Sequence, residues 1–202
     1  MLWNDFLNSN HHDWRGKEKS EDCLEKPEWL AAWCNEHGLV YPGDPSSDEL
    51  AVLKDFRGKL LRMVQTIVSG MELSADDLEE LNRVLADRPI VHRLRSADDG
   101  WRLETAPAAS DWRSIRTAIA LSFARTLTEG EAARIRICAN PDCRWVYYDR
   151  TRNRSKRYCD DRTCGNLMKV RRFRARQKSA DILPRSDPPG GATPENRSRK
   201  RL

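Results

Sequence analysis

The sequence lacks any long apolar run, and its first residues lack the order of basic, apolar and small residues that marks a secretory signal. A helix that crosses a bilayer needs about 20 predominantly apolar residues, so we expect no such helix in this chain. We therefore expect a cytoplasmic protein, in which thiols stay reduced and paired cysteines bind metal more often than they form disulfides. Histidine is also scarce, and the four histidines lie far in sequence from the main group of cysteines: His11, His12, His37 and His92.

Charge is abundant but unevenly distributed. The net charge of the whole chain is +5, yet residues 134–178 contain 15 Lys and Arg against 4 Asp and Glu, whereas residues 1–133 contain 16 against 24. This asymmetry indicates an acidic body joined to a basic segment. Residues 179–202 are rich in Pro, Gly, Ser and charge, so we expect a disordered tail there. The sequence thus predicts three parts: a body at 1–133, a small module at 134–178 and a tail at 179–202.

The body has the apolar spacing of helices. Ser46 and Glu49 have capping-box spacing, Ser74 is placed to cap a further helix, and Ser110 or Asp111 is placed to cap another. An apolar stripe after Ser74 consists of Leu78, Leu81, Val84 and Leu85. The predicted helices cover residues 27–37, 46–70, 74–87 and 110–130.

Two segments of the body have the alternation of strands. Residues 90–106 alternate around an Asp99-Gly100 turn and predict a β-hairpin. Residues 131–138 predict a short strand that leads into the basic segment. The predicted fold class is α+β, with a mainly helical N-terminal domain that includes a β-hairpin and a small C-terminal module built from a strand, a basic loop and a helix.

Four of the six cysteines lie in the basic segment, in two pairs of equal spacing. Cys138 and Cys143 are separated by four residues, Cys159 and Cys164 by four residues, and fifteen residues lie between the pairs. Short paired spacings allow two loops to complete the tetrahedral shell of four thiolates that structural zinc prefers. A module of about 40 residues also needs a metal ion or a cross-link to stabilise it, because so small a hydrophobic core cannot offset the conformational entropy that the chain loses on folding. We expect one structural Zn²⁺ at these four ligands.

Other roles for the cysteines are open at this point. Two disulfides, an iron–sulfur cluster, unpaired thiols or a redox or catalytic cysteine would each use some of them. Cys23 and Cys34 have no pairing pattern and are expected to be ordinary side chains of the helical body. His11 and His12 lie in an irregular segment and are expected to be solvated.

The residues around the cysteines predict a rigid basic surface. A strand around Trp145–Tyr148 is followed by a loop and then by a helix that starts near Cys164, with Leu167, Val170 and Phe173 or Arg174 on its inner face. Arginine exceeds lysine, which suits bidentate contacts to phosphate and guanine. The candidate nucleic-acid contacts are Arg150, Arg152, Asn153, Arg154, Lys156, Arg157, Lys169, Arg171, Arg172, Arg174 and Arg176.

Three uses of this surface compete. Double-stranded DNA is favoured, because each cation placed on a phosphate releases counterions. A protein-interaction module and a merely solvated face are the alternatives. RNA is a further alternative, since Trp145, Tyr147 and Tyr148 would stack on bases if they were not part of the small core.

The cysteine segment resembles a known family. The stretch "CANPDCRWVYYDRTRNRSKRYCDDRTCGNLMKVRRFRARQ" is similar to the CGNR zinc finger of bacterial proteins in its two cysteine pairs, its basic loop and its "KVRRFRAR" helix. The family pattern is Cys-Gly-Asn-Arg, whereas this chain has Leu167 in place of the arginine. The upstream "LWNDFLNSNHHDWRG…PEWLAAWCNEHGL" resembles, more loosely, the ABATE domain that accompanies this finger.

The resemblance implies a bacterial transcription regulator that acts in the cytoplasm and on the nucleoid. The finger, with a treble-clef-like fold, would bind DNA, and the body would sense a stress-related small-molecule effector or mediate self-association as a homodimer. Candidate ligand contacts are Trp3, Phe6, Asn8, Trp14 and Arg15, with the core of the body as their alternative role. A zinc-stapled adaptor for protein or RNA is the second hypothesis, and no catalytic triad or phosphate loop favours an enzyme.

Overall fold

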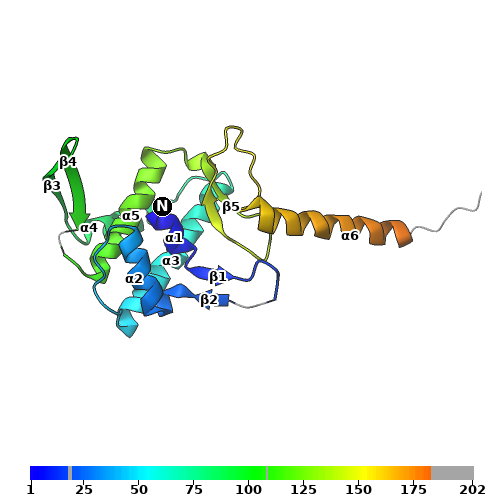
Figure 1. The fold of residues 1–202 in the computed structure, drawn as a ribbon, viewed down its shortest axis with the longest axis horizontal. Helices are drawn as coiled ribbons and strands as arrows, with labels where there is room; N and C mark the ends of the chain where they lie inside the picture. Colours follow the sequence, from blue (N-terminus) through cyan, green and yellow to red (C-terminus); the bar gives the residue numbers. More distant parts are fainter. Residues whose placement is uncertain (18–19, 108, 183–202) are drawn as a thin grey trace, which may run out of the picture. The chain divides into compact units, whose positions relative to one another are not determined.

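The computed structural model describes residues 1–17, 20–107 and 109–182, and the chain divides into two compact units, Met1–Leu167 and Met168–Leu202 (Figure 1). The segment from residue 183, most of the predicted tail, lies outside the described residues. Within the described residues, the strands form three two-stranded antiparallel sheets. None of the helices described combines the length and the apolar character that a membrane crossing requires.

The N-terminal segment forms a short helix and a small hairpin. Helix α1 spans Leu2–Leu7, and strand β1 (Asn10–His12) pairs with β2 (Ser20–Asp22). A 3₁₀ turn at Cys23–Glu25 follows, and the Asp22 carboxylate caps it by accepting a hydrogen bond from Leu24 N. This hairpin was not predicted, because three-residue strands of mostly polar residues show no apolar alternation.

Three of the predicted helices follow, and they are confirmed. They are α2 (Pro27–Glu36), α3 (Ser47–Val68) and α4 (Ala75–Ala86). Capping boxes at Ser46 and Ser74 define where α3 and α4 begin, because each serine accepts a hydrogen bond from the third helical residue. The predicted stripe of α4 is wrong at one position, since Leu78 is 47% exposed while Leu81 and Val84 are buried.

The predicted hairpin consists of β3 (Ile90–Ala97) and β4 (Gly100–Pro107). The predicted turn position is wrong by one residue, because Ala97 pairs with Gly100 and the turn residues are therefore Asp98 and Asp99. Gly100 has a φ of 125°, a value that L side chains rarely adopt, so glycine is needed at the start of the returning strand.

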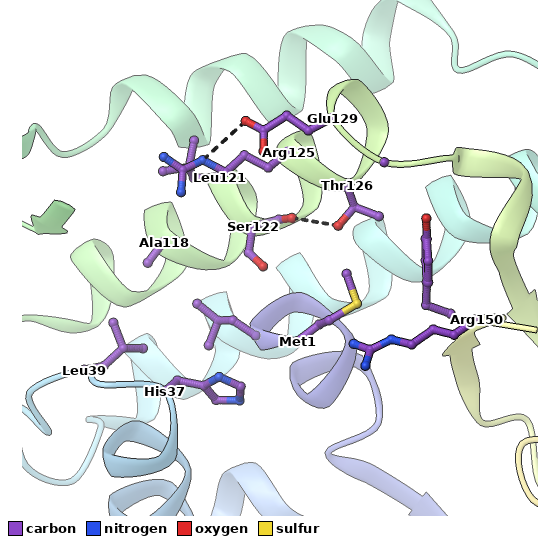
Figure 2. A pocket seen from close by; sticks show the side chains of 13 residues that line it. Met1, His37, Leu39, Ala118, Leu121, Ser122, Arg125, Thr126, Glu129 and Arg150 are labelled. Carbon is purple, nitrogen blue, oxygen red and sulfur yellow. Dashed lines mark hydrogen bonds and ion pairs between the residues drawn. The ribbon is translucent and has the colours of Figure 1, made fainter. Parts of the chain in front are cut away.

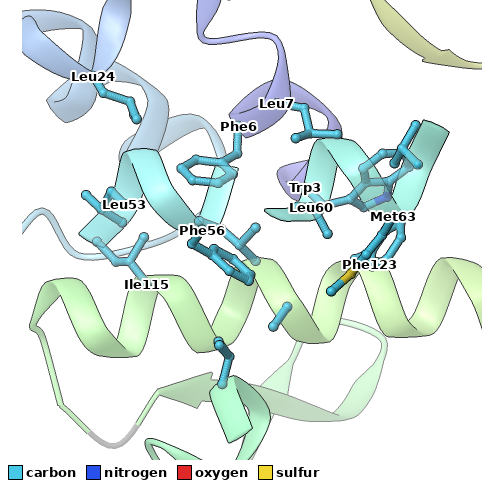
Figure 3. Packing of buried hydrophobic residues seen from close by; sticks show 14 of the residues in the cluster. Trp3, Phe6, Leu7, Leu24, Leu53, Phe56, Leu60, Met63, Ile115 and Phe123 are labelled. Carbon is cyan, nitrogen blue, oxygen red and sulfur yellow. The ribbon is translucent and has the colours of Figure 1, made fainter. Parts of the chain in front are cut away.

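The fourth predicted helix is also confirmed. Helix α5 (Trp112–Thr128) begins at Asp111, whose carboxylate accepts a hydrogen bond from Ser114 N. Apolar side chains of α1, α3 and α5 form the centre of the hydrophobic core (Figure 3), to which α2, α4 and the two strands of the basic segment also contribute. The largest fully buried side chains of α1, α3 and α5 include Trp3, Phe6, Leu60, Met63, Ile119 and Phe123.

The basic segment begins with a 3₁₀ turn at Ala132–Arg134, strand β5 (Ile135–Ile137) and strand β6 (Val146–Tyr148), and the two strands pair with each other. A single π-helical turn, Asp161–Gly165, leads into α6 (Asn166–Ile182). The predicted inner face of α6 is not observed for Val170 and Phe173, which are 38% and 60% exposed. The physical reason is that cations interrupt the apolar positions of α6, so it has no continuous apolar stripe to bury.

Candidate metal centre and nucleic-acid surface

The four cysteines of the basic segment converge on one point. Cys138 follows β5, Cys143 precedes β6, Cys159 lies just before the π-helical turn, and Cys164 lies within that turn. Their sulfurs all lie within 4.8 Å of one another, with Cys143 Sγ 3.6 Å from Cys159 Sγ and Cys159 Sγ 3.8 Å from Cys164 Sγ. Zn–S bonds of about 2.3 Å at tetrahedral angles place sulfurs about 3.8 Å apart, whereas a disulfide requires about 2.05 Å. The spacing fits a metal shell and not a disulfide.

Backbone and amide groups hold these ligands in place. Cys138 N donates to Trp145 O at 2.8 Å, and Cys159 N donates to Cys138 Sγ at 3.5 Å. Asn140 is fully buried, and its Nδ2 lies within hydrogen-bond distance of Cys164 Sγ at 3.4 Å and of Trp14 O at 2.8 Å. Such N–H donors orient thiolate ligands and stabilise their charge.

The chemistry of the cluster also suits a cation. Hydrogen bonds with Cys143 and Cys159 lower the pKa of Cys138, whereas hydrogen bonds within the same group raise the pKa of Cys143 and of Cys159, so a metal ion would displace the protons that these thiols share. Four thiolates this close repel one another unless a metal ion neutralises them. Because all four positions are filled by cysteine and three of the side chains are buried, the site is closed, as structural zinc sites are. The four cysteines are the ligands of one structural zinc ion.

Asp149 organises the basic loop that follows β6. Its carboxylate is fully buried, accepts hydrogen bonds from Thr151 N at 2.9 Å and Thr151 Oγ1 at 2.6 Å, and accepts a third from Lys156 N at 3.0 Å. Burial acts to raise the pKa of Asp149, but the hydrogen bonds from Thr151 and Lys156 N outweigh it and hold the pKa below its usual value. The sequence contains a signal for this turn, the Asp-x-Thr of "YDRTR", which was not used in the prediction.

Most of the predicted nucleic-acid contacts have exposed side chains. In the loop, Arg150, Arg152, Asn153, Arg154 and Arg157 are exposed and Lys156 is half-buried. Arg154 pairs with Glu131, and the Lys156 ammonium lies over the Tyr147 ring, 5.6 Å from its centroid. In α6, Arg171 is half-buried, and the exposed cations are Lys169, Arg172, Arg174 and Arg176.

The aromatic side chains of the finger form its core. Tyr147 is 8% exposed and its hydroxyl donates to Lys156 O at 2.7 Å. Trp145 is half-buried against the cysteine cluster, and Tyr148 Oη accepts a hydrogen bond from Glu131 N at 3.1 Å. These contacts leave little of the ring faces for stacking on bases.

The candidate ligand residues of the N-terminal segment do not gather in one cavity. Trp3 and Phe6 are fully buried in the core, where Trp3 Nε1 donates to Thr126 Oγ1 at 2.8 Å. Asn8 Nδ2 donates to Val146 O at 2.8 Å, and Val146 N donates to Asn8 Oδ1 at 2.9 Å. Trp14 packs against the cysteine cluster, and the Arg15 guanidinium lies 4.7 Å from the centre of its ring.

A cavity of about 570 Å³ lies elsewhere, where the helical body meets the segment after β6 (Figure 2). Helix α5 contributes Leu121 and Arg125, the N-terminal segment contributes Met1 and Leu2, and Arg150 enters from the basic loop. No sequence pattern marks this cavity, because its lining comes from four separate segments.

Comparison with known protein families accounts for both parts of the chain. Residues 1–130 match the ABATE family model, which is described as "putative stress-induced transcription regulator", and residues 134–177 match the CGNR zinc finger model. No curated protein matches the chain. Both families are regulatory or zinc-finger families and neither is enzymatic. The chain therefore belongs to the ABATE family and carries a CGNR zinc finger at its C-terminal side.

Proposed function

We propose that this protein regulates transcription by binding double-stranded DNA through its zinc finger. The observation that carries the proposal is the set of exposed cations on the loop 150–157, which lies between the two pairs of zinc ligands, and on α6, which follows the last ligand. The regulator would act in the bacterial cytoplasm, on the nucleoid.

The basic loop supports this proposal through its rigidity. The zinc ion fixes one end of the loop near Cys159, and the Asp149 carboxylate fixes the other. A loop held at both ends loses little conformational entropy when its arginines bind phosphate groups. Arginine suits this role because its planar guanidinium forms two parallel hydrogen bonds with a phosphate.

Helix α6 supports the proposal through the arrangement of its cations. At 3.6 residues per turn, Lys169, Arg172 and Arg176 share one side, while Arg171, Arg174 and Lys178 share another. A helix in the major groove has a phosphate backbone on each side of it, so two cationic stripes fit that position. Leu167 occupies the motif position where the family has arginine, and its side chain is half-buried. The chain therefore has one cation fewer at this position, while its four zinc ligands are unchanged.

A second role, sensing of a small molecule by the body, is favoured by the cavity of Figure 2. Its volume of about 570 Å³ is in the range that small ligands occupy, and its lining combines apolar side chains with Arg125 and Arg150. Because Arg150 belongs to both the cavity and the basic loop, a ligand that engages it would compete with DNA for the same cation. Self-association of the body is the alternative to ligand sensing.

The proposal is tested by the fluorescence anisotropy of a labelled duplex DNA titrated with the zinc-loaded full chain at about 50 mM salt. We expect binding to the duplex, weaker binding to a single-stranded RNA of the same sequence, and loss of binding after zinc is removed. Absence of duplex binding at this salt concentration would contradict the proposal and favour an adaptor for protein or RNA. Recovery of DNA bound to the protein in cells would then identify the target sequence.

A further inference from the structure

We propose that His11, Glu21 and Cys23 form a second metal site, which binds one exchangeable divalent ion of the thiolate-binding class, such as Zn²⁺. This site lies on the β1–β2 hairpin and shares no ligand with the finger. It does not depend on the proposed DNA binding.

The register of the hairpin places the three side chains on one face. His11 pairs directly with Glu21, and Cys23 N donates to Ser9 O at 2.8 Å, which extends the pairing by one step. Side chains two residues apart on a strand share a face, so Cys23 lies diagonally across from His11 on the face that also carries Glu21.

The distances suit a common metal ion. One ligand atom from each residue lies within 4.8 Å of the others, and Cys23 Sγ is 3.6 Å from His11 Nδ1 and 3.7 Å from His11 Nε2. Zn–N bonds of about 2.0–2.1 Å and Zn–S bonds of about 2.3 Å at a tetrahedral angle place S about 3.6 Å from the coordinating nitrogen and about 5 Å from the other ring nitrogen. Since Sγ lies at nearly equal distances from both nitrogens here, metal binding would turn the His11 ring so that one nitrogen points at the ion. A thiolate, an imidazole and a carboxylate together favour zinc over magnesium or calcium, which prefer oxygen ligands.

Contacts with Arg57 of α3 hold the hairpin in position. Arg57 binds the Asp22 carboxylate with two hydrogen bonds of 2.7 Å and 2.6 Å, and it also donates to Ser9 Oγ at 2.7 Å. Arg57 is 8% exposed, so this ion pair is well shielded from water. The strands that carry the three ligands are therefore anchored to α3 before any metal binds.

Three protein ligands leave one coordination position for water, as at zinc sites that remain open to exchange. His11 also lines a cavity of about 240 Å³ to which Asp5 and Glu36 contribute, and these carboxylates would attract a cation. A bound metal would displace the Lys26 ammonium from Glu21 and the proton from Cys23, whose pKa is raised by burial. Both displacements weaken binding, so we expect the ion to exchange readily, unlike the finger zinc.

A metal ion at this site would also act on the finger. The His11 ring lies 5.6 Å from the Trp145 ring, and Trp145 O accepts the hydrogen bond from Cys138 N at 2.8 Å. Coordination fixes the orientation of an imidazole. The occupied site would therefore stabilise the packing of Trp145 beside the first zinc ligand.

The test is a titration of the full chain, loaded with one zinc ion per chain, with Co²⁺ while zinc content is measured in the same samples. We expect a second metal equivalent, a thiolate-to-cobalt charge-transfer band and unchanged zinc content. Cys23→Ser and His11→Ala should lose the band and keep the finger zinc. Cys34→Ser is the matched control, because it removes a buried cysteine that lies outside both ligand groups, and it should keep the band.

His11→Ala keeps the test valid if Cys23→Ser does not fold, because His11 is only half-buried. The proposal is overturned if the wild-type chain takes up no second equivalent. It is equally overturned if cobalt enters only as zinc leaves, or if the band persists in both Cys23→Ser and His11→Ala.

Discussion

At the scale of single residues, Asn8 connects the segment that matches the ABATE family to the segment that matches the CGNR zinc finger. It is 5% exposed, and its amide forms one hydrogen bond with Val146 O and one with Val146 N. Asn4 Nδ2 donates to the same carbonyl at 2.9 Å. Strand β6 of the finger is thus bound to the N-terminal segment of the ABATE domain by side-chain amides, inside one compact unit.

We predict that Asn8→Ala destabilises the chain by roughly 1–3 kcal/mol, because it leaves Val146 N–H buried without its acceptor. The carbonyl keeps Asn4 as a donor, so the loss is that of one buried group. Denaturant unfolding of the zinc-loaded chain measures the effect. Asn82→Ala, on the exposed surface of α4, is the matched control and should change stability by no more than about 0.5 kcal/mol. Equal effects of the two substitutions would contradict this role for Asn8.

The residues differ in how far the sequence could predict their roles. Cys138, Cys143, Cys159 and Cys164 were predictable as zinc ligands because short paired spacings encode the site locally. Asn8 was not, since its partner Val146 lies 138 residues further along the chain and no local pattern marks it. The proximity of His11 and Cys23 was not predictable either, because it depends on the register of a hairpin whose strands are short and polar.

At the scale of elements, the helices of the body were predicted where local chemistry defines their ends. The helix caps can be recognised from the sequence, because each cap involves two residues three positions apart. They are the capping boxes at Ser46 and Ser74 and the Asp111 cap. The exposure of Leu78 and of Phe173 was not predictable from the helical spacing of apolar residues alone, since burial depends on which other element packs against that face of the helix. The hairpin turn was displaced by one residue because Asp98-Asp99 and Asp99-Gly100 are both good turn sequences.

The segment that connects α5 to the finger requires glycine at position 130. A Cβ atom added to Gly130 would lie 2.7 Å from Thr126 O and 3.4 Å from Tyr148 Oη. The first distance is too short for non-bonded atoms, so the end of α5 would have to move. Tyr148 belongs to β6, and the movement would also disturb the finger.

We predict that Gly130→Ala lowers the free energy of unfolding by roughly 1–3 kcal/mol through this overlap. The matched control is Gly58→Ala in α3, where the added Cβ meets only Arg62 Nη1 at 3.9 Å and the backbone is helical. Because glycine is a poor helix former, Gly58→Ala should raise stability by about 0.5–1 kcal/mol. Thermal unfolding distinguishes the two, and a stabilising effect of Gly130→Ala would contradict the predicted overlap.

At the scale of the whole molecule, the charge asymmetry of the sequence is the property that links fold and function. The acidic part of the chain coincides closely with the ABATE match at residues 1–130, and the basic part with the finger match at residues 134–177. This division was readable from charge and cysteine spacing, which are local properties. The joint between the parts was not, because it consists of long-range amide contacts and a cavity lined from four segments.

The measurement that tests the central claim most directly is the salt dependence of duplex DNA binding by the zinc-loaded chain. If the cations of the finger contact phosphates, the logarithm of the binding constant falls linearly with the logarithm of the salt concentration. The double substitution Arg171→Ala and Arg172→Ala should reduce this slope by about 2, since each lost phosphate contact lowers it by about 1. The matched control, Arg62→Ala with Arg93→Ala, removes the same charge from exposed positions of the body and should leave the slope unchanged. An equal reduction by both double variants, or no reduction by the first, would contradict DNA binding through the finger.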